Sequence, residues 1–162
     1  MLKPNSAFEK VTDISSDFLI NNNIKGIILD VDNTLIDLNS VPVDNIQEWI
    51  KKIKNAKIKV CIASNSLKKH KVENIAKILD VKYVFFSMKP LRVGLKKAKK
   101  ILGLEPKYIA EIGDQLFTDV LGANRMKMFS IITKPISPEK HFLTELKRKI
   151  EKKLLSKYNI NF

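Results

Sequence analysis

Short apolar segments alternate with longer amphipathic segments through most of this 162-residue chain, and that alternation limits the folds open to it. The apolar segments have the length of strands, whereas the segments between them repeat apolar residues every three or four positions, as helices do. Strands are therefore expected at residues 26–31, 58–63, 83–86, 108–112 and 128–132. Strands and helices that alternate in this way form parallel sheets with helices on both faces, so the sequence predicts a three-layer, doubly wound α/β fold.

The predicted helices have recognisable starts and ends. Pro90 suits the first turn of a helix, and Gly103 suits the position just after the last turn. Ser66 is placed to cap another helix through its hydroxyl group. Helices are expected from near Ser6 or Asp13 up to Asn21, and over residues 42–56, 66–79, 90–102, 116–124 and 138–158. The whole set fits a single domain of residues 1–162.

Composition places the chain among water-soluble globular proteins. Hydrophobic residues make up 44% and charged residues 29% of it, and no apolar run approaches the roughly 20 residues that span a bilayer. The first residues lack the basic and apolar regions of a secretory signal, so we expect a cytoplasmic protein. Cys61 is the only cysteine and lies within a predicted strand, which excludes a disulfide within the chain and a cluster of thiolate ligands.

The chain carries a formal net charge of +13, which attracts polyanions such as anionic lipid, nucleic acid or phosphorylated substrates. Only three of its thirty basic residues are arginine, and this counts against nucleic acid because base and phosphate recognition depends on the arginine fork. The basic amphipathic helix at residues 138–158 has two interpretations. Either it lies on an anionic membrane surface, or its apolar stripe packs on the sheet while the lysines face water. The stripe consists of Leu143, Leu146, Ile150 and Leu154.

Two aspartates follow the first predicted strand directly. Asp30 and Asp32 project from the same side of the chain because successive strand residues point to opposite faces. Carboxylates held this close repel each other unless a cation binds between them. Ligands collect at the carboxyl edge of parallel sheets, so the pair is a candidate site. Taken alone, the pair is equally compatible with a loop that has no chemical role.

Each later strand also ends in polar residues, and parallel strands bring those ends to one edge of the sheet. Ser64 and Asn65 follow the second strand and offer a hydroxyl group and backbone N–H groups to a phosphate. Lys89 follows the third strand, and the segment after the fourth adds Asp114 and Asp119. One by one these residues have ordinary structural explanations. Together with the aspartate pair, they predict a phosphate site.

The order of these groups resembles the haloacid dehalogenase superfamily of phosphatases, subfamily IIIA. Its four motifs are Asp-x-Asp-x-Thr, a serine or threonine after the second strand, a lysine, and Gly-Asp followed by a further aspartate. They match Asp30 to Thr34, Ser64, Lys89, and Gly113-Asp114 with Asp119. The motif variants are similar to those of the YqeG family, which is itself similar to the mitochondrial and plastid phosphatidylglycerophosphate phosphatases. The resemblance extends from residue 2 to about residue 132.

This resemblance implies a role for each residue. Asp30 is the nucleophile that forms an aspartyl phosphate, and Asp32 is the general acid and base. Mg²⁺ is implied as the cofactor, bound by Asp30, the backbone carbonyl of Asp32 and Asp114. The remaining positions are Ser64, Asn65 and Lys89 for the phosphoryl oxygens, with Thr34 and Asp119 as supporting residues.

The spacing of the motifs bears on the substrate. About thirty residues separate Asp32 from Ser64 and about twenty-five separate Ser64 from Lys89, which leaves no room for the cap domain that many superfamily members carry. An open site favours a large substrate or one presented on a surface, and a phospholipid head group meets that condition. The resemblance and the positive charge together favour phosphatidylglycerophosphate at a membrane surface as the substrate.

Two other interpretations stay open. The same chemistry could act on a soluble sugar or nucleotide phosphate or on a nucleic-acid end, although the sequence offers no aromatic strand face for stacking bases. A receiver-type phosphoacceptor domain also combines acidic residues, a lysine and Mg²⁺, but it needs a long-lived aspartyl phosphate, which an acid–base residue at Asp32 would shorten. The sequence does not decide the oligomeric state, or whether Gln115, Arg125 or the Lys68–Lys71 cluster contacts substrate.

Overall fold

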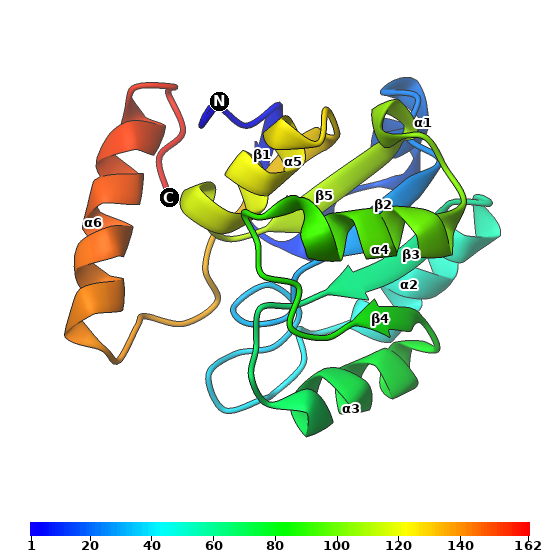
Figure 1. Ribbon diagram of the computed structural model, residues 1–162, viewed down its shortest axis with the longest axis horizontal. Coiled ribbons are helices and arrows are strands. Elements are labelled where there is room, and N and C mark those ends of the chain that lie inside the picture. The colour runs from blue at the N-terminus through cyan, green and yellow to red at the C-terminus, as the bar shows by residue number, and fades with distance from the viewer.

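One parallel sheet of six strands forms the centre of the structure, a computed structural model that describes residues 1–162 (Figure 1). The strands lie in the order β1-β6-β5-β2-β3-β4, and every neighbouring pair is parallel. Their bounds are β1 Ser6–Phe8, β2 Gly26–Leu29, β3 Lys59–Ala63, β4 Lys82–Val84, β5 Ile109–Gly113 and β6 Phe129–Thr133. The predicted parallel α/β fold is therefore confirmed.

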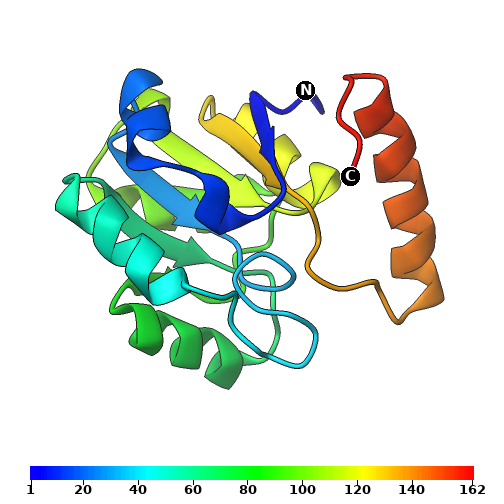
Figure 2. The ribbon, with the colours of Figure 1, turned by 180° about the vertical axis from the view of Figure 1, so that it is seen from behind.

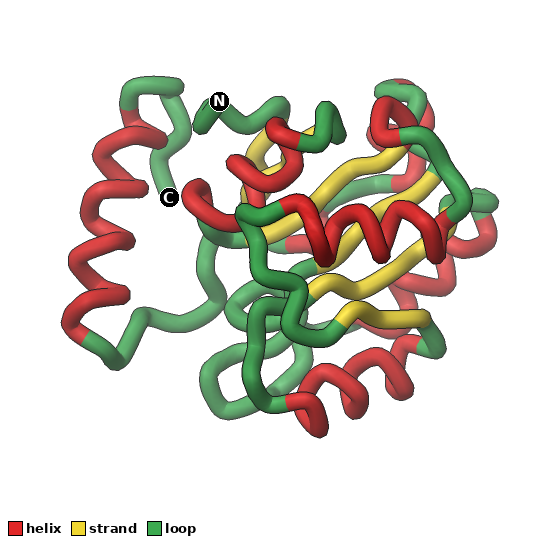
Figure 3. The backbone as a smooth tube through the Cα atoms, viewed as in Figure 1, coloured by secondary structure: helices red, strands yellow, loops and turns green.

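Helices cover both faces of the sheet and form the two outer layers (Figures 2 and 3). Helices α1, α2 and α3 pack on the face with the larger core cluster, and α4 and α5 pack on the other face. The α-helices are α1 Ser16–Asn21, α2 Ile46–Asn55, α3 Lys69–Leu79, α4 Arg92–Leu102, α5 Leu121–Arg125 and α6 Phe142–Ser156. The remaining helical elements are the 3-10 helices η1 Val11–Asp13 and η2 Pro106–Tyr108 and the π-helical turn η3 Leu116–Val120.

The central strand β2 shows why the predicted strands are continuous apolar runs. Ile27 and Leu29 belong to the core on the side of α1, α2 and α3, whereas Ile28 belongs to the core on the side of α4. All three side chains are fully buried because both faces of a parallel sheet are covered. Trp49 of α2 belongs to the larger core and donates its indole N–H to the Ile14 carbonyl oxygen over 2.7 Å. The strand that leads to the aspartate pair is thus held from both sides.

The amino-terminal segment differs from the prediction. Residues expected to begin a helix at Ser6 form strand β1 instead, which pairs with β6 at the sheet edge and makes a sixth strand. Helix α1 begins only at Ser16, where Ser15 caps it by accepting a hydrogen bond from the Phe18 N–H over 3.0 Å. Apolar residues of η1 and α1 and of the segment between them face the same core, which imitates the periodicity of one longer helix.

Helix α3 also begins later than predicted. Ser66 does not cap it, because the helix starts at Lys69 and the residue before it makes no side-chain cap. The Ser66 hydroxyl group instead accepts a hydrogen bond from the Lys68 N–H over 3.1 Å. The Ser66 N–H in turn donates to Ser64 Oγ over 3.1 Å. These turns keep the segment after β3 as a loop at the edge of the sheet.

Helix α6 lies at one end of the molecule, beside η3 and the carboxyl terminus (Figure 1). Leu155 is its buried apolar anchor and packs on residues of η3 and β6. Arg148 and Glu151 also face the body of the protein, and Glu151 is buried. No helix of the structure, α6 included, has the length and apolar character needed to cross a membrane.

The predicted apolar stripe of α6 does not pack on the sheet. Leu143, Leu146 and Ile150 have relative exposures of 77%, 47% and 49%. Leu154, at the end of the stripe, is partly buried beside the apolar anchor of the helix. The interpretation in which the stripe covers the sheet is therefore wrong for most of its length, and α6 presents an apolar face to solvent.

Candidate active site

The segments that follow β2, β3, β4 and β5 meet at the carboxyl edge of the sheet, where ligands bind in parallel α/β folds. The connections from β2 to β3 and from β3 to β4 each contain one helix, α2 or α3, and no inserted domain. The edge is therefore not covered by a cap domain, which confirms the expectation from the motif spacing.

The ammonium group of Lys89 is the centre of a polar cluster at this edge. Its side chain is fully buried, and Nζ lies 2.9 Å from Asp30 Oδ1, 3.0 Å from Glu111 Oε1 and 2.8 Å from Asp119 Oδ1. The lysine thus joins the end of β2, strand β5 and the turn η3. When all three carboxylates are ionised, they exceed the one ammonium by two negative charges, which a bound divalent cation would balance.

Burial favours the protonated forms of two of these carboxylates, Asp30 and Glu111. It raises the pKa of Asp30 to about 8, against the lowering effect of Lys89. Burial also raises the pKa of Glu111 to about 8, and Lys89 again opposes the shift. For Lys89 itself, burial lowers the pKa, but the three carboxylates outweigh burial and raise it well above its usual value. Lys89 is therefore charged, while Asp30 can release its proton to solvent when a cation binds.

Three buried aspartates can share one cation. One oxygen each of Asp30, Asp114 and Asp119 lies within 4.8 Å of the other two. Carboxylate oxygens are the preferred ligands of Mg²⁺ and other hard divalent cations. Together with the excess negative charge, this donor set fits a divalent metal ion. Asp119, predicted only as a supporting residue, is part of the candidate ligand group itself.

Asp32 lies apart from the buried cluster. Its side chain is 36% exposed at the open edge and contacts the ammonium group of Lys71 from α3. The structure therefore brings Asp30 and Asp32 to the same edge, but one carboxylate is buried and the other faces solvent. The side chain of Asp32 is not part of the aspartate group that can share a cation, so any contact with a metal falls to its backbone carbonyl.

The loop after β3 holds the Lys89 segment in place. Asn65 Oδ1 accepts hydrogen bonds from the Lys89 N–H and from Ser87 Oγ, both over 2.7 Å. Asn65 Nδ2 donates to the Lys89 carbonyl oxygen over 2.8 Å. The side chain of Asn65, predicted to bind phosphate, is thus occupied mainly by this segment. Ser64 is buried, and its hydroxyl group accepts the N–H of Ser66 but donates to no protein group, so it can still donate to a phosphate.

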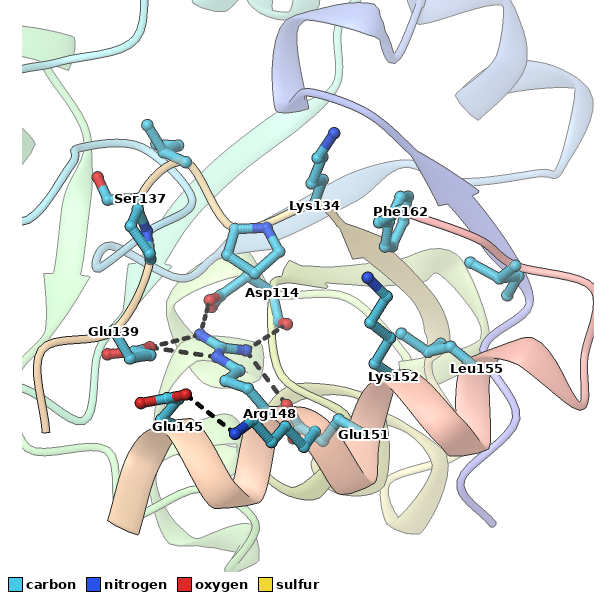
Figure 4. A pocket seen from close by; sticks show the side chains of 15 residues that line it. Asp114, Lys134, Ser137, Glu139, Glu145, Arg148, Glu151, Lys152, Leu155 and Phe162 are labelled. Carbon is cyan, nitrogen blue, oxygen red and sulfur yellow. Dashed lines mark hydrogen bonds and ion pairs between the residues drawn. The ribbon is translucent and has the colours of Figure 1, made fainter. Parts of the chain in front are cut away.

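Asp114 has a different partner for each of its carboxylate oxygens. Oδ1 accepts a hydrogen bond from Thr34 Oγ1 over 3.4 Å, while Oδ2 contacts the guanidinium group of Arg148 from α6 (Figure 4). Burial raises the pKa of Asp114 to about 7, and Arg148 opposes this shift. Thr34 thus contacts a candidate metal ligand, and a second contact to that ligand comes from the carboxyl-terminal helix.

Sequence reasoning missed two residues of this site, Glu111 and Arg148, and left a third, Lys71, undecided as part of the Lys68–Lys71 cluster. Glu111 lies within a buried strand, where a lone carboxylate needs a partner cation, so its position was a usable signal. Lys71 and Arg148 lie in helices that carry many other basic residues. Nothing in the sequence separates them from basic residues that face solvent.

The sequence left open whether Gln115, Arg125 and the Lys68–Lys71 cluster contact substrate. Of these, only Gln115 contacts the carboxylate cluster. The Gln115 N–H donates to Asp119 Oδ2 over 3.0 Å and so helps to fix a candidate metal ligand. Arg125 donates to the Pro90 carbonyl oxygen over 3.3 Å. Lys68, Lys69 and His70 are exposed at the start of α3, whereas Lys71 contacts the carboxylate of Asp32.

Gly113 allows Asp119 to approach the end of β5. A Cβ atom at position 113 would lie 2.3 Å from the Asp119 carboxyl carbon. We therefore expect Gly113→Ala to displace Asp119 from the cluster and to lower kcat/KM for a phosphomonoester by about tenfold or more. Gly122→Ala is a suitable control, because a Cβ atom there would lie 3.1 Å from a flexible methyl group of Leu95. Equal kcat/KM values for both variants would show that the close approach of Asp119 to Gly113 does not affect catalysis.

If the acidic cluster binds Mg²⁺, the pKa shifts predict how the gain in stability depends on pH. Asp30 and Glu111 have folded-state pKa values of about 8 against ordinary values of 3.8 and 4.5. Between the ordinary pKa values and about pH 8, these two groups keep protons in the folded state that they lose in the unfolded state. The free energy of unfolding without metal therefore falls as the pH rises through this range. Mg²⁺ must displace those protons. We expect it to raise Tm more at about pH 8 than at about pH 6, as measured by differential scanning calorimetry. An equal or smaller gain at the higher pH would contradict this expectation.

Sequence comparison agrees with the geometry of the site. The family model described as mitochondrial PGP phosphatase matches residues 1–137. The protein of Bacillus subtilis (strain 168) described as "Probable phosphatase YqeG" is 32% identical over 156 residues, which cover 94% of this chain and 89% of that protein. The similarity therefore includes the loops that carry the polar cluster as well as the sheet beneath them.

Solved structures show the same fold at low sequence identity. An uncharacterized protein from Listeria monocytogenes serotype 4b has a TM-score of 0.58 at 17% identity, over 83% of this chain and 99% of that chain. The cobalt-bound deoxy-D-mannose-octulosonate 8-phosphate phosphatase of Haemophilus influenzae has a TM-score of 0.55 at 17% identity, over 83% and 89% of the two chains. Because the family model spans most of the residues and the four motifs meet at one edge, this chain belongs to the mitochondrial PGP phosphatase family and is a phosphatase of the haloacid dehalogenase superfamily.

Proposed function

We propose that this phosphatase hydrolyses phosphomonoesters through an aspartyl phosphate on Asp30, with Mg²⁺ as its cofactor. The observation that carries the proposal is the buried carboxylate of Asp30, which Lys89 contacts at Oδ1 while Asp114 and Asp119 lie beside it. The other oxygen of Asp30 is left to act as a nucleophile. Ser64 is the candidate donor for the phosphoryl oxygens, over which the charge of the transition state is spread. The three N–H groups of Lys89 face carboxylates, so its contribution is a positive charge beside the phosphoryl group.

The two aspartates divide the reaction between them. In the first step Asp30 attacks phosphorus, the bond from phosphorus to the ester oxygen breaks, and Asp32 gives its proton to the departing alkoxide. In the second step Asp32 takes a proton from a water molecule, whose oxygen attacks phosphorus. The bond from phosphorus to Asp30 then breaks and inorganic phosphate leaves. The exposed position of Asp32 at the open edge suits this exchange with water and leaving group.

The candidate ligands for Mg²⁺ are Asp30, Asp114, Asp119 and the backbone carbonyl of Asp32. When bound, the metal ion would neutralise negative charge on the phosphoryl group and on the carboxylates around it. The remaining residues keep these carboxylates in place: Lys89 holds Asp30 and Asp119, and Thr34 holds Asp114.

We infer that the substrate is phosphatidylglycerophosphate. Three observations support this inference: the family model carries the description PGP phosphatase, the edge has no cap domain, and the net charge is +13. An uncapped edge can meet a head group at a membrane surface, whereas a soluble metabolite would stay exposed to water there. The positive charge favours an anionic lipid that carries a phosphodiester as well as the phosphomonoester.

Phosphate release by the purified protein tests the substrate directly. Phosphatidylglycerophosphate in mixed micelles is compared with glycerol 3-phosphate, sugar phosphates and nucleoside monophosphates. We expect kcat/KM for the lipid to exceed that for every soluble ester by about 100-fold or more. A soluble ester that is turned over equally well would contradict the lipid substrate, while loss of all activity in Asp30→Asn would still support the reaction.

We further infer that α6 docks the protein on anionic membranes. Its exposed apolar residues Leu143, Leu146 and Ile150 form a stripe on the outer side of the helix. Two exposed lysines of the same helix, Lys149 and Lys153, border this stripe. An apolar stripe bordered by lysines fits the boundary between acyl chains and acidic head groups, where each lysine adds about 1 kcal/mol.

Sedimentation with vesicles of phosphatidylcholine and phosphatidylglycerol tests this docking. We expect Leu143→Ser combined with Ile150→Ser to weaken binding by about tenfold or more, and added salt to weaken binding of the unaltered protein. Ile78→Ser is the control, because Ile78 is 47% exposed on α3, away from α6. If both variants bind the vesicles equally well, α6 is not the docking element.

A further inference from the structure

Helix α6 supplies an arginine to the active site from outside the region that the family model covers. The matched region ends at residue 137, whereas Arg148 lies in the second turn of α6. Its side chain is only 14% exposed and points toward Asp114 (Figure 4). None of the four phosphatase motifs contains this residue. A mostly buried arginine on a helix rich in exposed lysines therefore calls for a specific explanation.

The guanidinium group of Arg148 contacts Asp114 at two places. One terminal nitrogen donates to the Asp114 backbone carbonyl oxygen over 2.8 Å, and the other contacts carboxylate oxygen Oδ2. A guanidinium group is planar and presents its donors in fixed directions, so a pair of contacts fixes both the backbone and the carboxylate of one residue. The rounded ammonium group of a lysine could not fix both in this way.

Two glutamates hold the arginine in this orientation. Glu139 accepts hydrogen bonds from Nε over 3.1 Å and from a terminal nitrogen over 2.9 Å. Glu151 accepts from the other terminal nitrogen over 3.2 Å and also accepts the Phe117 N–H of η3 over 3.1 Å. With Asp114 included, each of the five N–H groups of Arg148 has an acceptor. The side chain is therefore fixed before any ligand arrives.

The two carboxylate oxygens of Asp114 have different partners. Oδ2 faces Arg148, whereas Oδ1 lies 3.4 Å from the Thr34 hydroxyl group. Asp114 also belongs to the group of aspartates that can share a cation. Arg148 therefore occupies one oxygen of a candidate metal ligand and leaves the other oxygen available.

We propose that Arg148 is a positioning residue, which orients Asp114 for metal binding, so that α6 completes the metal site. The proposal rests on the proposed metal-dependent function and extends it to a helix outside the motifs. Residues that orient a metal ligand commonly change metal affinity by about 10- to 100-fold when they are replaced. Metal affinity, measured without turnover, is therefore the property that Arg148 should control.

Isothermal titration calorimetry of the full-length protein with Mg²⁺ tests the proposal. We expect Arg148→Ala to raise the Kd for Mg²⁺ by about tenfold or more, and Arg148→Lys to have an intermediate effect. Lys149→Ala is the matched control: it removes a positive charge at the next position, where the only partner is the exposed Glu145 at 3.1 Å, and should leave Kd unchanged. Unchanged or tighter Mg²⁺ binding by Arg148→Ala would overturn the proposal.

A second variant separates the loss of the guanidinium group from loosening of the helix. Leu155→Ala weakens the apolar anchor of α6 but keeps Arg148, and trypsin cleavage at the exposed Lys140 reports how firmly α6 is held. We expect Arg148→Ala to bind Mg²⁺ more weakly than Leu155→Ala even where both are cleaved at the same rate. Equal affinities in that comparison would overturn the positioning role. Failure of the unaltered protein to bind Mg²⁺ would instead contradict the proposed cofactor.

Discussion

Asp30→Asn is expected to abolish phosphomonoester hydrolysis, with a fall in kcat of at least about 10³-fold. Asparagine keeps the shape of aspartate, but its amide oxygen is a poor nucleophile and cannot form the acyl phosphate. The variant should also lose the carboxylate that we propose as a metal ligand. Steady-state phosphate release, with a substrate that the unaltered protein hydrolyses readily, measures the effect.

The fold of this variant should be intact. Burial raises the pKa of Asp30 to about 8, so the charged carboxylate is costly in the protein without metal, and a neutral amide should give an equal or higher Tm. Asp32→Asn, at the exposed position, should lower kcat by about 10²- to 10⁴-fold, the range for a general acid or base. A folded Asp30→Asn protein with full activity would exclude Asp30 as the nucleophile.

Lys89→Met is expected to give the largest loss of stability among single substitutions in the site. Methionine fills a similar volume, but Asp30, Glu111 and Asp119 would remain buried without the cation that they surround. Removal of one partner from a buried ion pair costs about 3–5 kcal/mol, because the charge left behind is uncompensated. Urea denaturation should show this decrease in the free energy of unfolding, together with loss of activity.

The source of that decrease can be tested with a second substitution. Glu111→Gln removes one of the three negative charges, so it should restore part of the stability when it is combined with Lys89→Met. The single Glu111→Gln variant leaves Lys89 with two carboxylate partners and should be much less affected. If the double variant is no more stable than Lys89→Met, repulsion among the buried carboxylates is not the cause.

Local sequence patterns predicted most of the sheet correctly because its strands are buried on both faces. Residues such as Ile27, Ile28 and Leu29 have to be apolar at every position, and this makes the strand visible in the sequence. Strand β1 lacked that signal, since it has three residues at the sheet edge and is only partly buried. Its pairing with β6 depends on contacts between segments more than 120 positions apart, which local patterns do not contain.

The candidate site was predictable where its residues follow strands. Asp30, Lys89, Asp114 and Asp119 each come after a strand, so the parallel topology brings them together. Arg148 follows no strand and reaches the site because Leu155 and Glu151 fix the position of a distant helix. No pattern in that helix distinguishes this arginine from its exposed neighbours, and only the three-dimensional structure reveals its contacts.

The same limit explains the prediction for the apolar face of α6. Helical periodicity correctly identified a stripe with Leu143, Leu146 and Ile150, but it could not tell which face of an amphipathic helix turns inward. In the structure the inward face is the one with Arg148 and Glu151, whose hydrogen bonds offset the cost of burial. A polar face can thus be the buried one when its partners are in place.

Detection of a phosphoryl group on Asp30 is the most direct test of the proposed chemistry. Acetyl phosphate has a leaving group that needs no proton, so Asp32→Asn should still form the aspartyl phosphate but hydrolyse it slowly. After acid quenching and mass spectrometry, we expect the peptide that contains Asp30 to gain the mass of one phosphoryl group, and to lose it on treatment with hydroxylamine. The absence of this adduct, or an adduct on another residue, would contradict the assignment of Asp30 as the nucleophile.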